Sequence, residues 1–143
     1  MADFVFNIVK GAFVEKFRDA AANGIVILST AQEAEDAAKD HDELNAYFGA
    51  AGNTEASGGG YGRKTGLTGT ITVDDTNNRV DVDIPDQTWT ALTGTAITDL
   101  MVAYEESAAE TGRLPLTSHD FAVTLDGSDV TAQFNAAGFG RAA

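Results

Sequence analysis

The 143-residue sequence contains no cysteine, which excludes disulfide bonds, thiolate metal ligands and thiol catalysis. Basic residues are scarce as well: 9 Lys and Arg stand against 22 Asp and Glu, so the formal net charge is −13. A field of this sign repels phosphate groups, and we therefore expect no binding to nucleic acid or to an anionic membrane surface. Long apolar runs are also missing, since no stretch approaches the roughly 20 residues that span a membrane. Without a basic leader or a small-residue cleavage site near its start, the sequence predicts a protein made in the cytoplasm and carried out of it only on a particle.

What the sequence does contain is typical of a folded domain. Hydrophobic residues make up 43% of it, an ordinary share that argues against wholesale disorder. The length favours a single domain over residues 1–143. We predict the α+β class, with a strand-helix-strand-helix portion at 1–52, a flexible Gly-rich segment at 53–66, and a β-rich half at 67–143 built from antiparallel hairpins.

The clearest pattern lies at residues 67–90, LTGTITVDDTNNRVDVDIPDQTWT. Apolar and polar residues alternate in two runs, which indicates two strands that each have one buried and one solvated face. Ile71 and Val73 share a face in the first run, and Val80, Val82 and Ile84 share one in the second. The five residues between the runs are Asp, Thr and Asn, which favour tight turns. The segment therefore predicts a β-hairpin.

The first fifty residues show the patterns of strands and helices in turn. Expected strands cover residues 3–9 and 25–28, and expected helices cover 12–22, 31–39 and 41–51. Phe13 and Phe17 give the first helix its apolar stripe, and Asn23-Gly24 supplies a left-handed C-cap. Two later pairs, Thr30 with Glu33 and Asp40 with Glu43, have the spacing of capping boxes.

Residues 53–69 are rich in glycine. We expect either a mobile loop or an extended segment ordered by its neighbours, at a boundary between the two halves or at a contact between subunits. Farther on, residues 97–104 predict a strand and residues 105–111 a loop. A second hairpin is expected from His119, with Asp126-Gly127 at its turn and a second strand that ends at Phe134.

Three features could carry chemistry, and for each a plain structural role is favoured. Asp74, Asp75 and Asn77 could offer oxygens to Ca²⁺, but the segment lacks the residue order of an EF-hand loop, and a polar turn accounts for it. His41 and His119 stand beside aspartates without a third partner, and residues 118–120 (Ser-His-Asp) form no triad because triads assemble from distant positions. The glycines of residues 58–62 lack the frame of a phosphate-binding P-loop. We expect no catalytic, cofactor-binding or metal-binding residues.

Candidate interface residues fall in two groups. Tyr61, Arg63 and Lys64 place two of the few basic side chains beside an aromatic ring on the Gly-rich segment, which suits an anchor onto an acidic partner surface; a solvated loop is the alternative. Aromatic and basic residues also stand at the two ends of the chain, where they can be buried in the core or between chains: Phe4, Phe6, Phe139 and Arg141. For the N-terminal pair we favour the core.

The segments VDDTNNRVDVDIPDQTWT (73–90) and SHDFAVTLDGSDVTAQFNAAGFGRAA (118–143) resemble a family of small virion proteins encoded in the structural gene clusters of tailed bacteriophages. MADFVFNIVKG at the start and YGRKT at 61–65 fit the same family, and the similarity runs at intervals over most of the chain.

This resemblance implies a non-enzymatic structural protein of the virion. The expected role is that of a capsid decoration or minor capsid protein, which binds the major capsid protein on the outer surface of the head and stabilises the shell. It also implies self-association as a homo-oligomer, for which we expect a trimer. The alternatives are a neck, tail or fibre-base component of the virion or, in a different class, a small-ligand or Ca²⁺-binding module or an unrecognised hydrolase.

Overall fold

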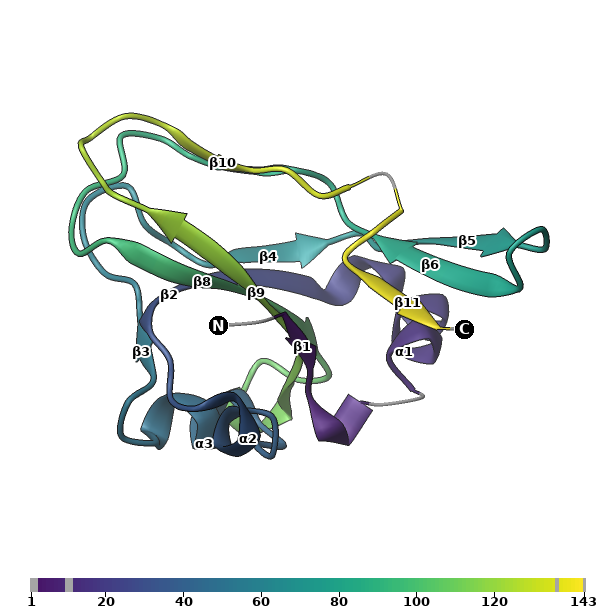
Figure 1. Ribbon diagram of the computed structural model, residues 1–143. Coiled ribbons are helices and arrows are strands. Elements are labelled where there is room, and N and C mark those ends of the chain that lie inside the picture. Colours follow the sequence, from purple (N-terminus) through teal and green to yellow (C-terminus); the bar gives the residue numbers. More distant parts are fainter. Residues whose placement is uncertain (1–2, 10–11, 136, 143) are drawn as a thin grey trace.

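A six-stranded antiparallel sheet takes strands from both halves of the chain (Figure 1). The computed structural model describes residues 3–9, 12–135 and 137–142. The strand order is β1-β9-β8-β2-β3, and β4 pairs with β2 along the same edge as β3. The bounds of these strands are β1 (Phe4–Val5), β2 (Gly24–Ala31), β3 (Thr54–Glu55), β4 (Lys64–Leu67), β8 (Ile97–Glu105) and β9 (Arg113–Val123). The chain is thus rich in antiparallel β-structure with a small share of helix, which confirms the predicted class at that level.

The strands β2 and β8 form the centre of the sheet because they are apolar on both faces. Residues 25–28 have no exposed surface, and residues 100–103 are at most 3% exposed. The register pairs Ile25 with Ala103 and Leu28 with Leu100. Both strands were expected from their continuous apolar runs, and both are confirmed.

The predicted hairpin over residues 119–134 is wrong. Strand β9 instead pairs with β8, around a turn that ends in the 3₁₀ helix η3 (Glu110–Gly112). It contains Pro115, which lies at a register shift opposite Ala103, where a missing N–H is tolerated. The chain after Gly127 leads to β10 (Val130–Ala132), which pairs with β7 (Gln87–Trp89) in a separate two-stranded sheet. The predicted strand also began too late, at His119, whereas β9 begins at Arg113.

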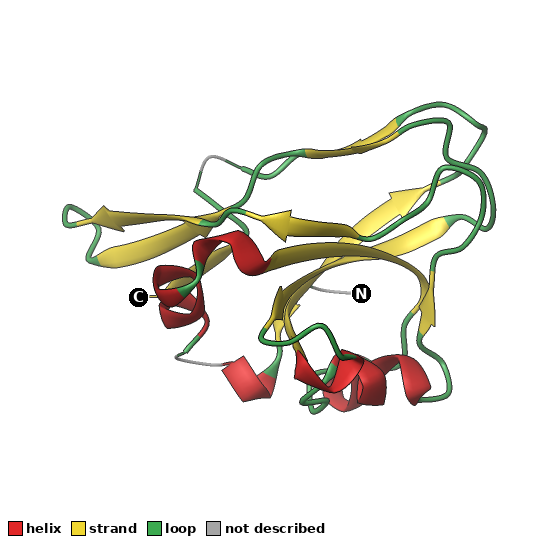
Figure 2. Cartoon of the chain, turned by 180° about the vertical axis from the view of Figure 1, so that it is seen from behind, coloured by secondary structure: helices red, strands yellow, loops and turns green. Residues whose placement is uncertain are grey.

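The helices are short, and except for the 3₁₀ turn that leads directly into β2 they lie below the sheet as drawn in Figure 1, an arrangement also seen from behind in Figure 2. Their bounds are η1 (Asn7–Val9), α1 (Phe13–Asp19), η2 (Ala21–Asn23), α2 (Glu35–Ala38) and α3 (Leu44–Gly49). The apolar stripe of α1 is confirmed, since Phe13 and Phe17 are both buried. No helix in the described part of the chain is long and apolar enough to cross a membrane.

Several predicted bounds in the first fifty residues need correction. The first strand ends at Val5, because the backbone then turns and Phe6 packs edge-on against Tyr47, with ring centroids 5.7 Å apart. The two helices expected at 31–39 and 41–51 shrink to α2 and α3, and neither carries a side-chain capping bond. Gly24 is extended, with φ −69°, and begins β2 instead of capping a helix.

The Gly-rich segment is extended and is ordered by contacts with neighbouring strands and loops, which was one of the two alternatives expected. Its ends form β3 and β4, which lie on β2, and Thr93 N donates a hydrogen bond to the Gly59 carbonyl at 2.9 Å. Gly58 has a φ of +136°, and a Cβ there would lie 2.1 Å from the Thr93 carbonyl oxygen. Only glycine permits this close approach of two backbones.

Candidate functional site

A three-stranded β-sheet extends from one end of the molecule, at the right of Figure 1 and the left of Figure 2. It consists of β5 (Thr70–Asp74), β6 (Arg79–Asp83) and β11 (Gly140–Ala142) in the order β11-β6-β5, and we call it the arm. The register pairs Ile71 with Val82 and Val73 with Val80, so the predicted hairpin is confirmed. Its turn contains Asn78 in the left-handed region with φ 52°, a conformation that asparagine tolerates well.

One face of the arm is apolar, and only its base is covered. Val82 and Ile84 are at most 2% exposed, and helix α1 packs against β5 and β6. Phe139, just before β11, fits between α1 residues Phe13 and Phe17, with ring centroids at 6.4 and 5.7 Å. Toward the tip this cover ends, and Val73 is 65% exposed. The arm therefore presents an uncovered apolar side chain on a well-anchored strand.

The opposite face of the arm is tied together by charge. Asp81 is 6% exposed and accepts hydrogen bonds from Arg79 Nε at 3.0 Å and from Arg141 Nε at 2.8 Å. Arg79 Nε also lies 3.1 Å from Asp74. These ion pairs link all three strands, so the arm is held in one shape before any partner arrives. Arg141, a predicted interface residue, thus lies on the arm and within this network.

Asp74 begins the acidic turn of the arm, and its carboxylate bonds within the turn. Asp74 accepts hydrogen bonds from the backbone N of Asn77 at 3.1 Å and from its Nδ2 at 2.7 Å. The side-chain bond from Asn77 is the main reason that the pKa of Asp74 lies below its ordinary value. Among the described residues no group of three or more His, Cys, Asp or Glu could hold a metal ion. The hydrogen bonds of Asp74 thus hold the turn itself together.

The predicted anchor at residues 61–64 is engaged within the chain. Arg63 makes two hydrogen bonds to Glu55, at 2.7 and 2.6 Å, and two to Glu110, at 2.7 and 2.9 Å. Tyr61 Oη donates to Glu55 at 2.6 Å, and Lys64 Nζ lies 5.4 Å from the centroid of the Trp89 ring. The bonds to Glu110 tie the Gly-rich segment to the turn between β8 and β9.

The three phenylalanines among the predicted interface residues are largely buried within the chain itself. Phe4 is 9% exposed and Phe6 is fully buried, as favoured from the sequence. Phe139 is 8% exposed. Of the seven candidates, the arm thus brings together Phe139 and Arg141, whereas the N-terminal pair belongs to the core. Sequence reasoning did not single out Val73 because the alternating pattern shows which face is apolar but not how far along a strand that face is covered.

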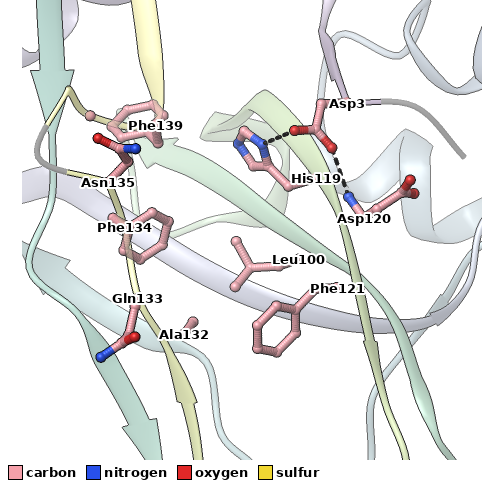
Figure 3. A pocket seen from close by; sticks show the side chains of 11 residues that line it. Asp3, Leu100, His119, Asp120, Phe121, Ala132, Gln133, Phe134, Asn135 and Phe139 are labelled. Atoms are coloured by element: carbon pink, nitrogen blue, oxygen red, sulfur yellow. Dashed lines mark hydrogen bonds and ion pairs between the residues drawn. The ribbon is translucent and has the colours of Figure 1, made fainter.

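A cavity of about 330 Å³ lies between β9 and the segment that follows β10 (Figure 3). Its lining combines apolar and polar residues: Asp3, Leu100, His119, Asp120, Phe121, Ala132, Gln133, Phe134, Asn135, Gly138 and Phe139. Asp3 accepts a hydrogen bond from the backbone N of Asp120 at 2.9 Å and lies 3.3 Å from Nδ1 of His119. Burial raises the pKa of Asp3, but these two partners outweigh it and bring the pKa below the ordinary value.

His119 also joins Asp3 to a hydroxyl group. Its Nε2 lies 2.9 Å from Thr117 Oγ1, which completes a carboxylate, imidazole and hydroxyl in the order of an activated nucleophile. Thr117, however, is 2% exposed and lies outside the lining of the cavity. The contacts instead fasten the start of the chain to β9. The adjacent Ser118 points elsewhere and donates to Gln32, which agrees with the expectation that residues 118–120 form no triad.

Comparison with other proteins adds no relative from which a function could be transferred: no family model, curated protein or solved structure matches this chain.

Proposed function

We propose that this chain is a non-enzymatic structural protein of a bacteriophage virion, and that it binds the outer surface of the head shell and stabilises it. The arm is the observation that carries the proposal. It combines an uncovered apolar residue, Val73, with a strand, β5, that pairs only with β6 in the described structure. Such a surface suits adhesion to another protein. The phage context comes from the sequence resemblance of residues 73–90 and 118–143.

The arm is built to bind at low entropic cost. Ion pairs of Asp81 with Arg79 and Arg141 hold the three strands together, and Phe139 anchors β11 to α1. A surface that is ordered in the free protein loses less conformational entropy when a partner docks. Repetition of a modest contact over a symmetric shell then adds up to a stable coat through avidity.

The proposed partner is the major capsid protein, and the proposed location is the exterior of the capsid. A net charge of −13 disfavours contact with packaged nucleic acid and suits a solvent-facing position. Self-association as a homo-oligomer is part of the proposal. The trimer expected from the resemblance would place copies on local threefold positions of the shell.

Fractionated phage tests the location. Virions are disrupted, heads and tails are separated on a density gradient, and the chain is quantified in each fraction by mass spectrometry. We expect it with the heads, in many copies for each particle. Recovery with the tails would contradict the head assignment and support the neck, tail or fibre-base alternative.

Binding to heads from phage that lack the gene tests the arm. Val73→Glu places a charge on the uncovered apolar residue, and we expect it to abolish co-sedimentation with the heads. Ile8→Glu is the matched control, because Ile8 is the other exposed large hydrophobic residue in the described structure, at 44%, and lies outside the arm. Equal binding by the two variants would show that adhesion does not depend on the arm.

A further inference from the structure

The free edge of β5 lacks the devices that normally keep sheet edges from pairing with other chains. Natural edge strands are protected by short length, by lysine or proline, or by bulges. The outer strands β1 and β3 of the large sheet have two residues each, and β11 on the other side of the arm has three. β5 has five residues, Thr-Ile-Thr-Val-Asp, and pairs with β6 without any register shift. β4, with four residues, carries Lys64 and pairs with β2 across a register shift, so among these outer strands β5 is the longest and pairs most regularly.

The sequence of β5 is complementary to itself in the antiparallel direction. If two copies pair with Thr72 opposite Thr72, then Val73 lies opposite Ile71 of the second copy. By symmetry, Ile71 lies opposite Val73 of the second copy, so two apolar pairs form. Thr70 then lies opposite Asp74, so no two carboxylates face each other directly. Neighbouring apolar residues across strands stabilise a sheet, whereas like charges directly opposite destabilise it. A shift of the register by one residue in either direction would place apolar side chains opposite threonines or the aspartate and lose both apolar pairs.

The faces of the two arms also agree in this register. Ile71 and Val73 lie on the same face of the arm as Val82 and Val80, the residues of β6 that they pair with. A two-fold axis perpendicular to the sheet keeps that face on one side of both copies. The exposed Val73 would therefore gain an apolar neighbour from the second copy, and the apolar surface of the two arms would be continuous.

We propose that β5 is a self-pairing edge, through which two copies of this chain join antiparallel around a two-fold axis at Thr72 into one six-stranded sheet, β11-β6-β5 continued by its symmetry mate. The self-complementary register favours a second copy as the occupant over an unrelated strand. The pair uses the same strand and the same Val73 that carry the proposed head contact, so in a pair the head would meet the joint apolar face of the two arms and not the edge of β5. Cysteine cross-linking of the free protein tests the pair, whereas fractionation of heads and tails tests the virion role.

Charge sets the conditions under which the pair forms. Each copy carries −13, and this repulsion opposes association at low ionic strength. Because salt screens the repulsion while leaving the apolar and backbone contacts in place, we expect the dimer fraction to rise with NaCl concentration. A contact driven by opposite charges would show the reverse dependence.

Single cysteines provide a clean test, because the chain has none of its own. Directly opposed residues in a sheet have Cα atoms about 4.5–5.5 Å apart, within the range of a disulfide, whereas residues offset by two positions are about 7–8 Å apart, beyond it. Purified Thr72→Cys should therefore oxidise to a covalent dimer, on the order of tenfold faster than Val73→Cys. Thr88→Cys, at an exposed position on β7, is the control for random collision.

Light scattering on the unmodified chain provides the second measurement. We expect the mass to rise from 14.9 kDa toward twice that value with increasing protein and salt concentration, and Val73→Glu to remain monomeric. A monomer at all concentrations would overturn the proposal, and a trimer would overturn it in favour of the threefold oligomer that the resemblance implies. Equal cross-linking of the three cysteine variants, or none by Thr72→Cys, would overturn it as well.

Discussion

Arg63 connects parts of the molecule that are far apart in the sequence, and its replacement by alanine is a sharp test of what holds the Gly-rich segment in place. The guanidinium lies between Glu55 of β3 and Glu110 of η3, with two hydrogen bonds to each. It also lies 5.5 Å from the centroid of the Phe48 ring. Arg63→Ala removes all of these contacts at once and leaves two carboxylates on either side of the vacated space.

The size of the effect follows from the exposure of the partners. A hydrogen bond to a charged group contributes about 1.5–3 kcal/mol where water is excluded, but bonds that share one guanidinium do not add. The side chain of Arg63 is 18% exposed, that of Glu55 26% and that of Glu110 38%, so water recovers part of each lost bond. We therefore expect the free energy of unfolding to fall by about 2–3 kcal/mol in total, or roughly 5–10 °C in melting temperature for a domain of this size.

Urea denaturation followed by circular dichroism measures this difference. Arg18→Ala is the matched control, because Arg18 also stands near two acids, Glu15 and Asp19, but its side chain is 64% exposed. We expect the control to change the unfolding free energy by less than about 0.5 kcal/mol. Equal effects of the two substitutions would refute the view that the Arg63 cluster is a structural clamp.

The pH dependence of the Arg63→Ala effect has a definite sign. Burial raises the pKa of Glu110, but Arg63 and Arg113 outweigh it and bring the pKa below its ordinary value. A group whose pKa is lowered by folding stabilises the protein above its unfolded pKa, and this contribution is lost as the pH falls through the lowered value. The deficit of Arg63→Ala should therefore be full at neutral pH and shrink in acid.

Two further substitutions test the anchoring of the arm and the cost of a buried charge. Phe139→Ala empties the space between Phe13 and Phe17, and we expect a loss of about 2–4 kcal/mol together with faster carboxypeptidase digestion of the C-terminus; unchanged digestion would contradict an anchoring role. Asp99 is 4% exposed, and burial raises its pKa. Its ionised form therefore opposes folding as the pH rises through this raised pKa. Asp99→Asn should stabilise the protein by about 1 kcal/mol at pH 7. The advantage should vanish below about pH 4, and an advantage that persists there would show that charge is not its cause.

Local pairing is the part of the fold that the sequence predicts well. The hairpin of β5 and β6 is confirmed because alternation and turn residues lie within one short stretch. The central strands β2 and β8 are confirmed because their apolar runs allow little else. In each case the information that specifies the structure lies in neighbouring residues.

Pairing between residues far apart in the chain could not be predicted from the sequence. The strand β10 follows an expected turn at Gly127, yet it pairs with β7, about forty residues earlier, and not with β9. Arg63 finds Glu110, which is 47 residues away, although the sequence suggested an external acidic partner. An alternating pattern states which side chains share a face, but not which segment of the chain covers that face. For this reason neither the exposure of Val73 nor the burial of Phe139 could be predicted from the sequence.

We propose that the arm is the surface by which this chain adheres to a phage head. An electron cryo-microscopy reconstruction of the virion tests it most directly. We expect density for the chain on the outside of the shell, with β5 and Val73 buried against protein. Density for the chain absent from the shell, or present there with the arm projecting into solvent, would contradict it.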